Sequence, residues 1–372
     1  MNRRVIIGVT ILLAAAVSVL CIAACASPPG DRDGGDGDYI IGVSYFAGWW
    51  GRHDGWAKNL QDARLLYPER VPLLGTLISQ ETMDREIIAA SEYGVDYFQI
   101  LWYPHYSPDV INTEGAQRLN EGVTFFMDSP ENHRMRFSVE YCNHLPFRVT
   151  DEDSWKEICA ELVSFMHHPQ YLRIGGKPML KIHTIRNFVT DAGGMRTAMS
   201  WITYLRALAR EEGVGELLLG AGATASDTFA GAQVLLEDFD YIQYYMDIPD
   251  FAPREKDYRY NLLMKRALDV AQIRAASPLL PYLPYIPAGW KPWFGGLGPF
   301  FSMPGRTQWR KALSDMKKMV DRNSRLRIPD GTESGQKMIN IYAWNEFSEG
   351  GIVAPNHGEG YMKLEEIRRV FK

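Results

Sequence analysis

Two glutamates near the C-terminus have the residue type and spacing that acid–base chemistry needs. Glu346 and Glu349 lie three residues apart, after an apolar run that ends at Trp344 and just before two glycines. Cleavage of a glycosidic bond commonly uses two carboxyl groups, one protonated to assist the leaving oxygen and one anionic. Neighbouring carboxylates oppose each other's ionisation, which separates their roles at one pH. The same spacing also occurs on solvated helix faces, so its meaning depends on the element that carries it.

The elements that must position this pair alternate regularly along the chain. Short apolar runs predict strands at 40–46, 95–102, 136–142, 178–183, 216–221, 241–246, 282–287 and 338–344. Amphipathic segments predict helices at 81–93, 113–127, 153–166, 195–212, 228–237, 258–275, 307–320 and 363–371. This alternation predicts one α/β domain, a single (β/α)8 TIM barrel over residues 39–372.

A doubly wound open sheet is the alternative to a barrel. Such a sheet usually carries a glycine-rich phosphate-binding turn after its first strand. Here the corresponding stretch runs from Tyr45 to Trp50 and is bulky and aromatic. The sequence therefore favours the barrel.

Barrel enzymes carry their chemistry at the C-terminal ends of the strands, and these ends are rich in aromatic and carboxylate residues. The stretches hold no cluster of Arg or Lys suited to phosphate and no nucleophile elbow. Aromatic rings stack on sugar faces and carboxylates accept from hydroxyls, so the predicted mouth suits a neutral, hydroxyl-rich ligand. The candidate substrate-binding residues are Tyr45, Trp49, Trp102, Tyr103, Glu140, His144, His183, Tyr245, Trp290 and Asn345.

For three of these residues a structural role is an alternative to contact with substrate. Trp102 and Tyr245 fit packing at the barrel rim as well as they fit a binding site. An inward carboxylate at Glu140 requires a partner, which favours a functional role.

The N-terminus has the features of an export signal. Arg3 and Arg4 precede an uncharged apolar run, and Ile22-Ala23-Ala24-Cys25 matches a bacterial lipoprotein cleavage box. We expect a signal peptide at 1–24, lipidation of Cys25 and a flexible tether at 25–38, rich in Gly and Asp. The protein would then be a membrane-anchored bacterial lipoprotein, periplasmic or at the cell surface. A plain secretory signal or a retained membrane anchor are the alternatives.

Charge and cysteine content narrow the remaining possibilities. The net charge is −5, which gives no electrostatic footprint for nucleic acid. Cys142 and Cys159 could form a disulfide in an oxidising compartment, but two buried free thiols, one on a strand and one on a helix, are favoured. The Cys and His spacings match no metal site, so we expect neither metal nor cofactor. A monomer is expected.

Several motifs resemble glycoside hydrolase family 99 and the related WbsX-type group. The stretch Trp344-Asn345-Glu346-Phe347-Ser348-Glu349-Gly350-Gly351 is similar to the Asn-Glu-Trp-x-Glu-Gly signature of that family. The stretches 42–50, 90–103, 168–178 and 289–290 resemble its first strand and loop, its second strand, the turn before its fourth strand and the loop after its seventh. The similarity spans about residues 40–371, and the order and spacing of these short motifs together make it fairly specific.

The resemblance implies a (β/α)8 fold and a metal-free retaining mechanism on an α-linked glycan, such as an α-mannan. Glu346 would act as the base toward the sugar's own 2-hydroxyl, forming a 1,2-anhydro sugar, and Glu349 as the general acid and base. Tyr45, Trp102, Glu140 and Tyr245 would contact substrate. The signature departs from the family at Phe347, at Ser348 and at 354–355, so the family's endo-α-mannosidase activity does not transfer directly.

Two other functions remain open at this point. WbsX-type relatives are often labelled glycosyltransferases, but an export signal does not suit an enzyme that uses cytoplasmic nucleotide sugars, and no Asp-x-Asp pair stands at a strand end. A non-catalytic glycan-binding lipoprotein on the same barrel is the third possibility, against which the retained Glu pair argues.

Overall fold

The computed structural model describes residues 39–49, 65–104, 117–223, 237–254, 256–292 and 298–372. The expected signal peptide, Cys25 and the tether to residue 38 therefore lie outside the described residues, as does most of the helix expected at 228–237. Among the described segments, no helix is both long and apolar enough to cross a lipid bilayer.

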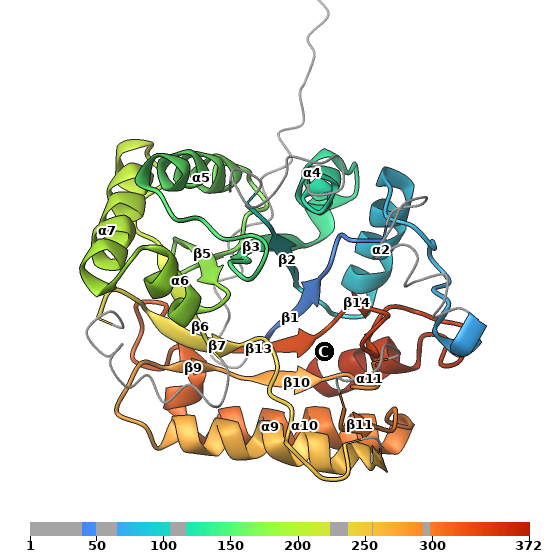
Figure 1. Ribbon diagram of the computed structural model, residues 1–372. Coiled ribbons are helices and arrows are strands. Elements are labelled where there is room, and N and C mark those ends of the chain that lie inside the picture. Colours follow the sequence, from blue (N-terminus) through green and yellow to red (C-terminus); the bar gives the residue numbers. More distant parts are fainter. Residues whose placement is uncertain (1–38, 50–64, 105–116, 224–236, 255, 293–297) are drawn as a thin grey trace, which may run out of the picture. The chain divides into compact units, whose positions relative to one another are not determined.

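A ring of parallel strands forms the centre of the domain, and helices surround it (Figure 1). The neighbouring strands of the ring all pair in parallel. Their bounds are β1 (Ile40–Tyr45), β2 (Tyr97–Trp102), β3 (Arg136–Tyr141), β5 (Lys177–Ile182), β6 (Leu218–Ala223), β7 (Tyr241–Tyr244), β9 (Tyr282–Leu283), β10 (Tyr285–Pro287) and β13 (Gln336–Tyr342). The (β/α)8 barrel predicted from the sequence is confirmed.

The ring closes through a strand that the sequence predicted as one continuous run. Residues 282–287 instead form two pieces, β9 and β10, with Pro284 between them. β9 pairs with β7 and β10 pairs with β13, so the two pieces together fill the place of a single barrel strand. Proline has no N–H to donate to a neighbouring strand, which accounts for the interruption. The carbonyl of Pro284 still accepts from the N–H of Asn340, at 3.0 Å.

The helices that cover the barrel also follow the predicted pattern. They are α2 (Gln80–Glu92), α4 (Glu121–Asp128), α5 (Glu152–Phe165), α6 (Ile185–Asp191), α7 (Met195–Glu211), α9 (Tyr260–Ala275), α10 (Arg306–Arg322) and α11 (Met362–Phe371). α4 is shorter than the expected helix at 113–127, and the seven-residue α6 was not predicted. Gly94 and Gly213 adopt positive φ just past the ends of α2 and α7, where the sequence predicted that helices stop.

Shorter elements join these layers. They are the strands β4 (Arg173–Ile174), β8 (Asp257–Tyr258), β11 (Phe300–Phe301), β12 (Arg327–Ile328), β14 (Asn345–Glu346) and β15 (Gly351–Ile352), and the 3-10 turns η1 (Pro68–Arg70), η2 (Asn132–Arg134) and η3 (Ser324–Leu326). β14 and β15 pair antiparallel and form a small hairpin directly after β13. This hairpin carries the two glutamates of the sequence motif.

Apolar packing closes the N-terminal end of the barrel. A buried cluster there includes Tyr97, Met179, Leu218, Tyr241 and Met338, each near the start of a barrel strand. Cys142 and Cys159 are buried free thiols, Cys142 directly after β3 and Cys159 within α5, as the sequence favoured. The barrel is thus filled from below, and open space lies at the opposite end, where the strands finish.

Candidate active site

A cavity of about 320 Å³ lies at the C-terminal ends of the barrel strands. Side chains that follow β1, β2, β3, β5, β7, β10 and β13 converge on it. Its lining combines aromatic rings, two histidines and two glutamates: Phe46, Leu101, Tyr103, Leu119, His144, Phe147, His183, Tyr245, Met246, Ile248, Trp290, Tyr342, Glu346, Ser348 and Glu349. The described lining contains neither Lys nor Arg, so the cavity suits a ligand without negative charge.

The hairpin between β14 and β15 presents both glutamates to this cavity. Glu346 is the last residue of β14, and Glu349 lies in the turn that follows. The turn is held by two backbone bonds to the Glu346 carbonyl, one from the N–H of Glu349 at 3.1 Å and one from the N–H of Gly350 at 2.8 Å. Gly350 has φ +86°, a conformation that favours glycine. The turn expected to aim both carboxyl groups into the mouth is therefore present.

Each glutamate is oriented by a tyrosine hydroxyl. The hydroxyl of Tyr245 donates to Oε1 of Glu346 at 2.8 Å, and the hydroxyl of Tyr342 donates to Oε2 of Glu349. The two tyrosine rings pack edge to face, with centroids 5.0 Å apart. Because each ring is fixed by its neighbour, the two carboxyl groups are held in defined positions before any ligand binds.

Burial raises the pKa of both glutamates. For Glu346, desolvation raises the pKa well above its ordinary value, and the charge of Glu349 raises it further, against the hydrogen bond from Tyr245. Desolvation also raises the pKa of Glu349, while the Tyr342 hydroxyl lowers it. Two desolvated carboxyl groups that repel each other retain a proton toward neutral pH. The pair can then supply one acid and one base, which is the requirement of glycoside cleavage.

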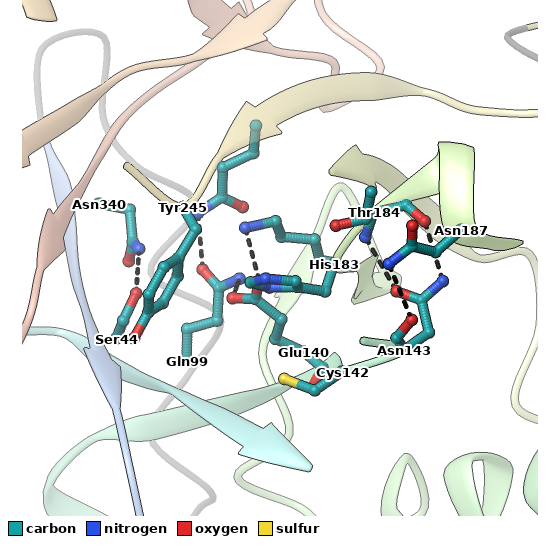
Figure 2. Close-up of polar contacts among 12 residues, drawn as sticks. Ser44, Gln99, Glu140, Cys142, Asn143, His183, Thr184, Asn187, Tyr245 and Asn340 are labelled. Carbon is teal, nitrogen blue, oxygen red and sulfur yellow. Dashed lines mark hydrogen bonds and ion pairs between the residues drawn. The ribbon is translucent and has the colours of Figure 1, made fainter. Parts of the chain in front are cut away.

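A buried ion-pair network lies beneath the cavity (Figure 2). Glu140 is fully buried, and its Oε1 lies 2.7 Å from Nζ of Lys181 and 2.6 Å from Nδ1 of His183. Its Oε2 accepts from Gln99 at 2.8 Å, and Gln99 in turn accepts from Gln243 at 2.7 Å. Desolvation by itself would raise the pKa of Glu140, but Lys181 and His183 outweigh it and lower that pKa to about 2. Glu140 is therefore an anion.

Five of the residues predicted to bind substrate line the cavity: Tyr103, His144, His183, Tyr245 and Trp290. They share it with Glu346 and Glu349. The other five do not line it. Glu140 lies below it, and Tyr45, Trp49, Trp102 and Asn345 are buried in packing around the barrel.

The contacts of two of these buried residues explain their positions. Tyr45 points away from the barrel axis, and its hydroxyl donates to Glu86 of α2 at 2.7 Å. Trp102 packs on the same outer side, against Tyr141 and Phe165. Strand residues alternate between the two faces, so a residue next to an inward one faces the helices.

Trp49 and Asn345 join the loop after β1 to the β14–β15 hairpin. The side chain of Asn345 accepts from the N–H of Phe46 and donates to its carbonyl, both at 2.8 Å. The indole N–H of Trp49 donates to the Asn345 carbonyl at 2.7 Å, and the ring packs on Phe347. These contacts support the hairpin from behind.

Three residues that the sequence reasoning missed complete the site: Tyr342, Lys181 and Arg70. Tyr342 lies on the predicted eighth strand, and Lys181 is the one charged residue in the interior of the predicted fourth strand, which was an available signal. The predicted need of Glu140 for a partner is met by Lys181 and His183 of the same chain. Arg70 carried no comparable signal, because it lies on a short 3-10 turn that is distant in sequence from every barrel strand.

Arg70 holds the β14–β15 hairpin against the loop after β10. Its side chain is buried, with Nη1 donating to the Phe347 carbonyl at 3.2 Å and Nη2 to the Lys291 carbonyl at 2.9 Å. The N–H of Lys291 donates to the Glu349 carbonyl at 2.7 Å. The guanidinium also lies 3.9 Å from the centroid of the Tyr67 ring. One side chain thus connects the turn between the two glutamates to a neighbouring loop.

Comparison with known proteins establishes the fold. No protein-family model matches the chain. The sequence is 24% identical over 226 residues to WxcX of Xanthomonas campestris pv. campestris, an uncharacterized protein; the match covers 56% of this chain. It covers only 29% of WxcX, so the chain corresponds to less than a third of that relative.

Solved structures with the same fold include glycoside hydrolases. The endo-α-mannosidase of family GH99 from Bacteroides thetaiotaomicron matches with a TM-score of 0.53 and 15% identity, covering 88% of this chain and 95% of that one. A GH5_18 protein from Bifidobacterium longum subsp. infantis matches with a TM-score of 0.52 and 10% identity, covering 89% and 78%. At these identities the likeness concerns the (β/α)8 fold.

Proposed function

We propose that the protein is a glycoside hydrolase that cleaves an α-linked glycan internally and with retention, through Glu346 and Glu349. One observation carries the proposal: both carboxyl groups are desolvated, each is held by a tyrosine, and both line the cavity at the C-terminal end of the barrel. The aromatic lining and the absence of Lys and Arg among its described members favour a neutral sugar.

We propose that the reaction runs through the sugar's own 2-hydroxyl, as the family 99 resemblance implies. Glu346 takes the 2-hydroxyl proton while that oxygen attacks the anomeric carbon, and Glu349 protonates the leaving oxygen. Glu349 then takes a proton from water, the water opens the 1,2-anhydro ring, and Glu346 returns its proton to the 2-oxygen. Attack from the face opposite the leaving group requires a 1,2-trans glycoside, and an α-mannoside satisfies this requirement.

The ionisation of Glu346 depends on the charge of its neighbour Glu349. The charge of Glu349 is one of the causes that raise the pKa of Glu346. Protonation of Glu349 removes that charge and makes ionisation of Glu346 easier. The state with a protonated Glu349 and an anionic Glu346 is the one in which the first step begins.

The test is cleavage of a polysaccharide panel by the soluble domain. We expect new reducing ends from an α-linked polymer such as α-mannan, with lower yields from β-linked polymers. Glu346→Gln and Glu349→Gln should each reduce the rate by about 10²- to 10⁴-fold, because each removes a proton-transfer group. Glu333→Gln, at an exposed position between β12 and β13, is the matched control and should leave the rate unchanged.

The outcomes separate the parts of the proposal. A Gln variant that keeps full activity would overturn the role of that glutamate. Normal cleavage of a 2-deoxy substrate would overturn the 2-hydroxyl route but leave the pair in place. Binding of glycans without any cleavage would favour a binding protein, and transfer from a nucleotide sugar would favour a glycosyltransferase.

We propose separately that Cys25 carries a lipid that anchors the protein to a bacterial membrane. The proposal rests on the cleavage box at 22–25 and the charged and apolar segments before it. Cells that express the full chain with a radiolabelled fatty acid should label the wild type and not Cys25→Ser. Equal labelling of the two proteins would refute this assignment.

A further inference from the structure

His183 lies between the buried network and the cavity. Its side chain is 19% exposed and lines the cavity, while Glu140 and Lys181 beneath it are 0% and 1% exposed. Nδ1 of His183 is 2.6 Å from Glu140. Nε2 is therefore the ring nitrogen that remains for a ligand in the cavity. Figure 2 shows the ring of His183 beside Glu140.

The partners of Glu140 determine which nitrogen of His183 carries a proton. An ionised carboxylate can only accept hydrogen bonds. Glu140 is anionic, since Lys181 lies 2.7 Å from it and Gln99 donates to its second oxygen. The proton must then be on Nδ1 of His183, because an unprotonated Nδ1 would face the carboxylate lone pairs at 2.6 Å.

Lys181 also decides whether Nε2 carries a second proton. Glu140 and Lys181 together are a neutral pair, so a positive charge on His183 would be a second cation beside the same carboxylate. The other groups that face His183 are the His144 ring, 5.7 Å away, and the Tyr245 ring, 5.3 Å away, neither of which supplies a negative charge at neutral pH. Glu346 lines the same cavity, and its Oε1 accepts from the Tyr245 hydroxyl at 2.8 Å.

We propose that Glu140 and Lys181 are positioning residues that keep His183 neutral, with Nδ1–H toward Glu140 and the lone pair of Nε2 toward the cavity. In this state His183 accepts a hydrogen bond from a sugar hydroxyl. The part that concerns sugar rests on the proposed function, whereas the tautomer is a property of the free protein. Glu140 itself is fully buried and does not line the cavity, so its proposed role is to position His183 and not to bind substrate directly.

The experiment is NMR of the free protein with ¹⁵N-labelled histidine at pH 7.5. His183→Asn identifies the resonances of His183. In the wild type we expect the pattern of a neutral ring protonated on Nδ1. In Lys181→Met, Glu140 loses its cation and His183 should become the imidazolium. In Lys181→Arg the charge is kept, and the wild-type pattern should be restored.

A double variant keeps the test decisive if Lys181→Met does not fold. Glu140→Gln combined with Lys181→Met removes both charges, so no buried ion is left unpaired. In this protein His183 should be neutral but no longer fixed as the Nδ1–H tautomer. A wild-type ring protonated on Nε2, or an unchanged pattern in Lys181→Met and in the double variant, would overturn the proposal.

The kcat/KM of the Lys181 variants is a second measurement, independent of the NMR spectra. Once a substrate is known, Lys181→Met should lower kcat/KM by about tenfold to a hundredfold, because an imidazolium cannot accept from the hydroxyl and leaves that group unpaired. Lys181→Arg should recover most of the loss. A variant with the predicted imidazolium and full activity would overturn the role of His183 toward substrate. A wild type that cleaves nothing counts against the proposed function, and the NMR result still decides the tautomer.

Discussion

Arg70 does not line the cavity, yet we predict that its replacement strongly disturbs the hairpin that carries Glu346 and Glu349. Arg70→Met keeps much of the length and apolar volume of the side chain but removes every donor. The carbonyls of Phe347 and Lys291 then lose the guanidinium that both now accept from. We expect the turn between Glu346 and Glu349 to loosen while the barrel itself remains folded.

The magnitude follows from these two hydrogen bonds. A buried acceptor left without a partner costs about 1–3 kcal/mol, so two carbonyls cost about 2–6 kcal/mol. Burial lowers the pKa of Arg70, which shows that the cation is desolvated, and its removal returns part of this cost. We expect a net loss of about 2–4 kcal/mol in local stability. A displacement of the carboxyl groups by about 1 Å would lower kcat by about a hundredfold.

Hydrogen exchange measured by mass spectrometry can test this prediction without a substrate. In Arg70→Met, amides of residues 345–352 and of the loop at 289–292 should exchange faster, while β1 to β3 should exchange as in the wild type. Arg134→Met is the matched control, because Arg134 lies on η2 and makes only an exposed ion pair with Glu131. Unchanged exchange at 345–352 in a folded Arg70→Met protein would refute the reasoning.

Three further predictions concern the ionisable groups. Tyr245→Phe and Tyr342→Phe each remove a hydrogen bond that lowers the pKa of a glutamate. Tyr245→Phe should move the acid limb of the kcat/KM profile, set by the base Glu346, to higher pH, and Tyr342→Phe should move the alkaline limb, set by the acid Glu349, to higher pH; an unmoved limb would contradict the role of that glutamate. Glu346→Gln should raise the urea midpoint at pH 8 and leave it nearly unchanged at pH 4, because the raised pKa of Glu346 makes its ionisation cost stability as the pH rises. Glu140→Gln should lower stability at pH 7 by about 3–5 kcal/mol, since it leaves Lys181 unpaired. The difference in the free energy of unfolding between the wild type and Glu140→Gln should become smaller as the pH falls from the ordinary carboxyl range toward about 2, the folded-state pKa of Glu140. A difference that does not change with pH would argue against the ion pair.

The barrel could be predicted because its signal is repeated along the whole chain. Parallel strands covered by helices are apolar on both faces, so each one appears as a short continuous run between amphipathic segments. The features that were missed are local. The break at Pro284 divides one run, and α6 is only seven residues long, too short to show a helical period.

The site was predicted less completely than the fold. A position at the end of a strand does not indicate whether the side chain faces the barrel interior or the surrounding helices. Where both faces are apolar, hydrophobicity does not distinguish the barrel interior from the helix side. Tyr45 and Trp102 were therefore included although they face helices, while Tyr342 on the inner face was missed. The polar residues of the strands would have fixed the inner face, since Gln99 and Lys181 are buried inside the barrel.

Those inner polar residues explain how a cavity with two desolvated glutamates is supported from below. The barrel interior beneath the site holds Ser44 bonded to Asn340 at 2.9 Å, and the chain from Gln243 through Gln99 to Glu140. The ion pair of Glu140 with Lys181 leaves this layer without net charge, and neither residue is among the causes that shift the pKa of Glu346 or Glu349. The acid–base properties of the pair are then set by its own burial, by the mutual repulsion of the two groups and by the two tyrosines. Lys181→Met, which moves the positive charge opposite Glu140 from Lys181 to His183 at the cavity wall, should therefore disturb catalysis even though Lys181 does not line the cavity.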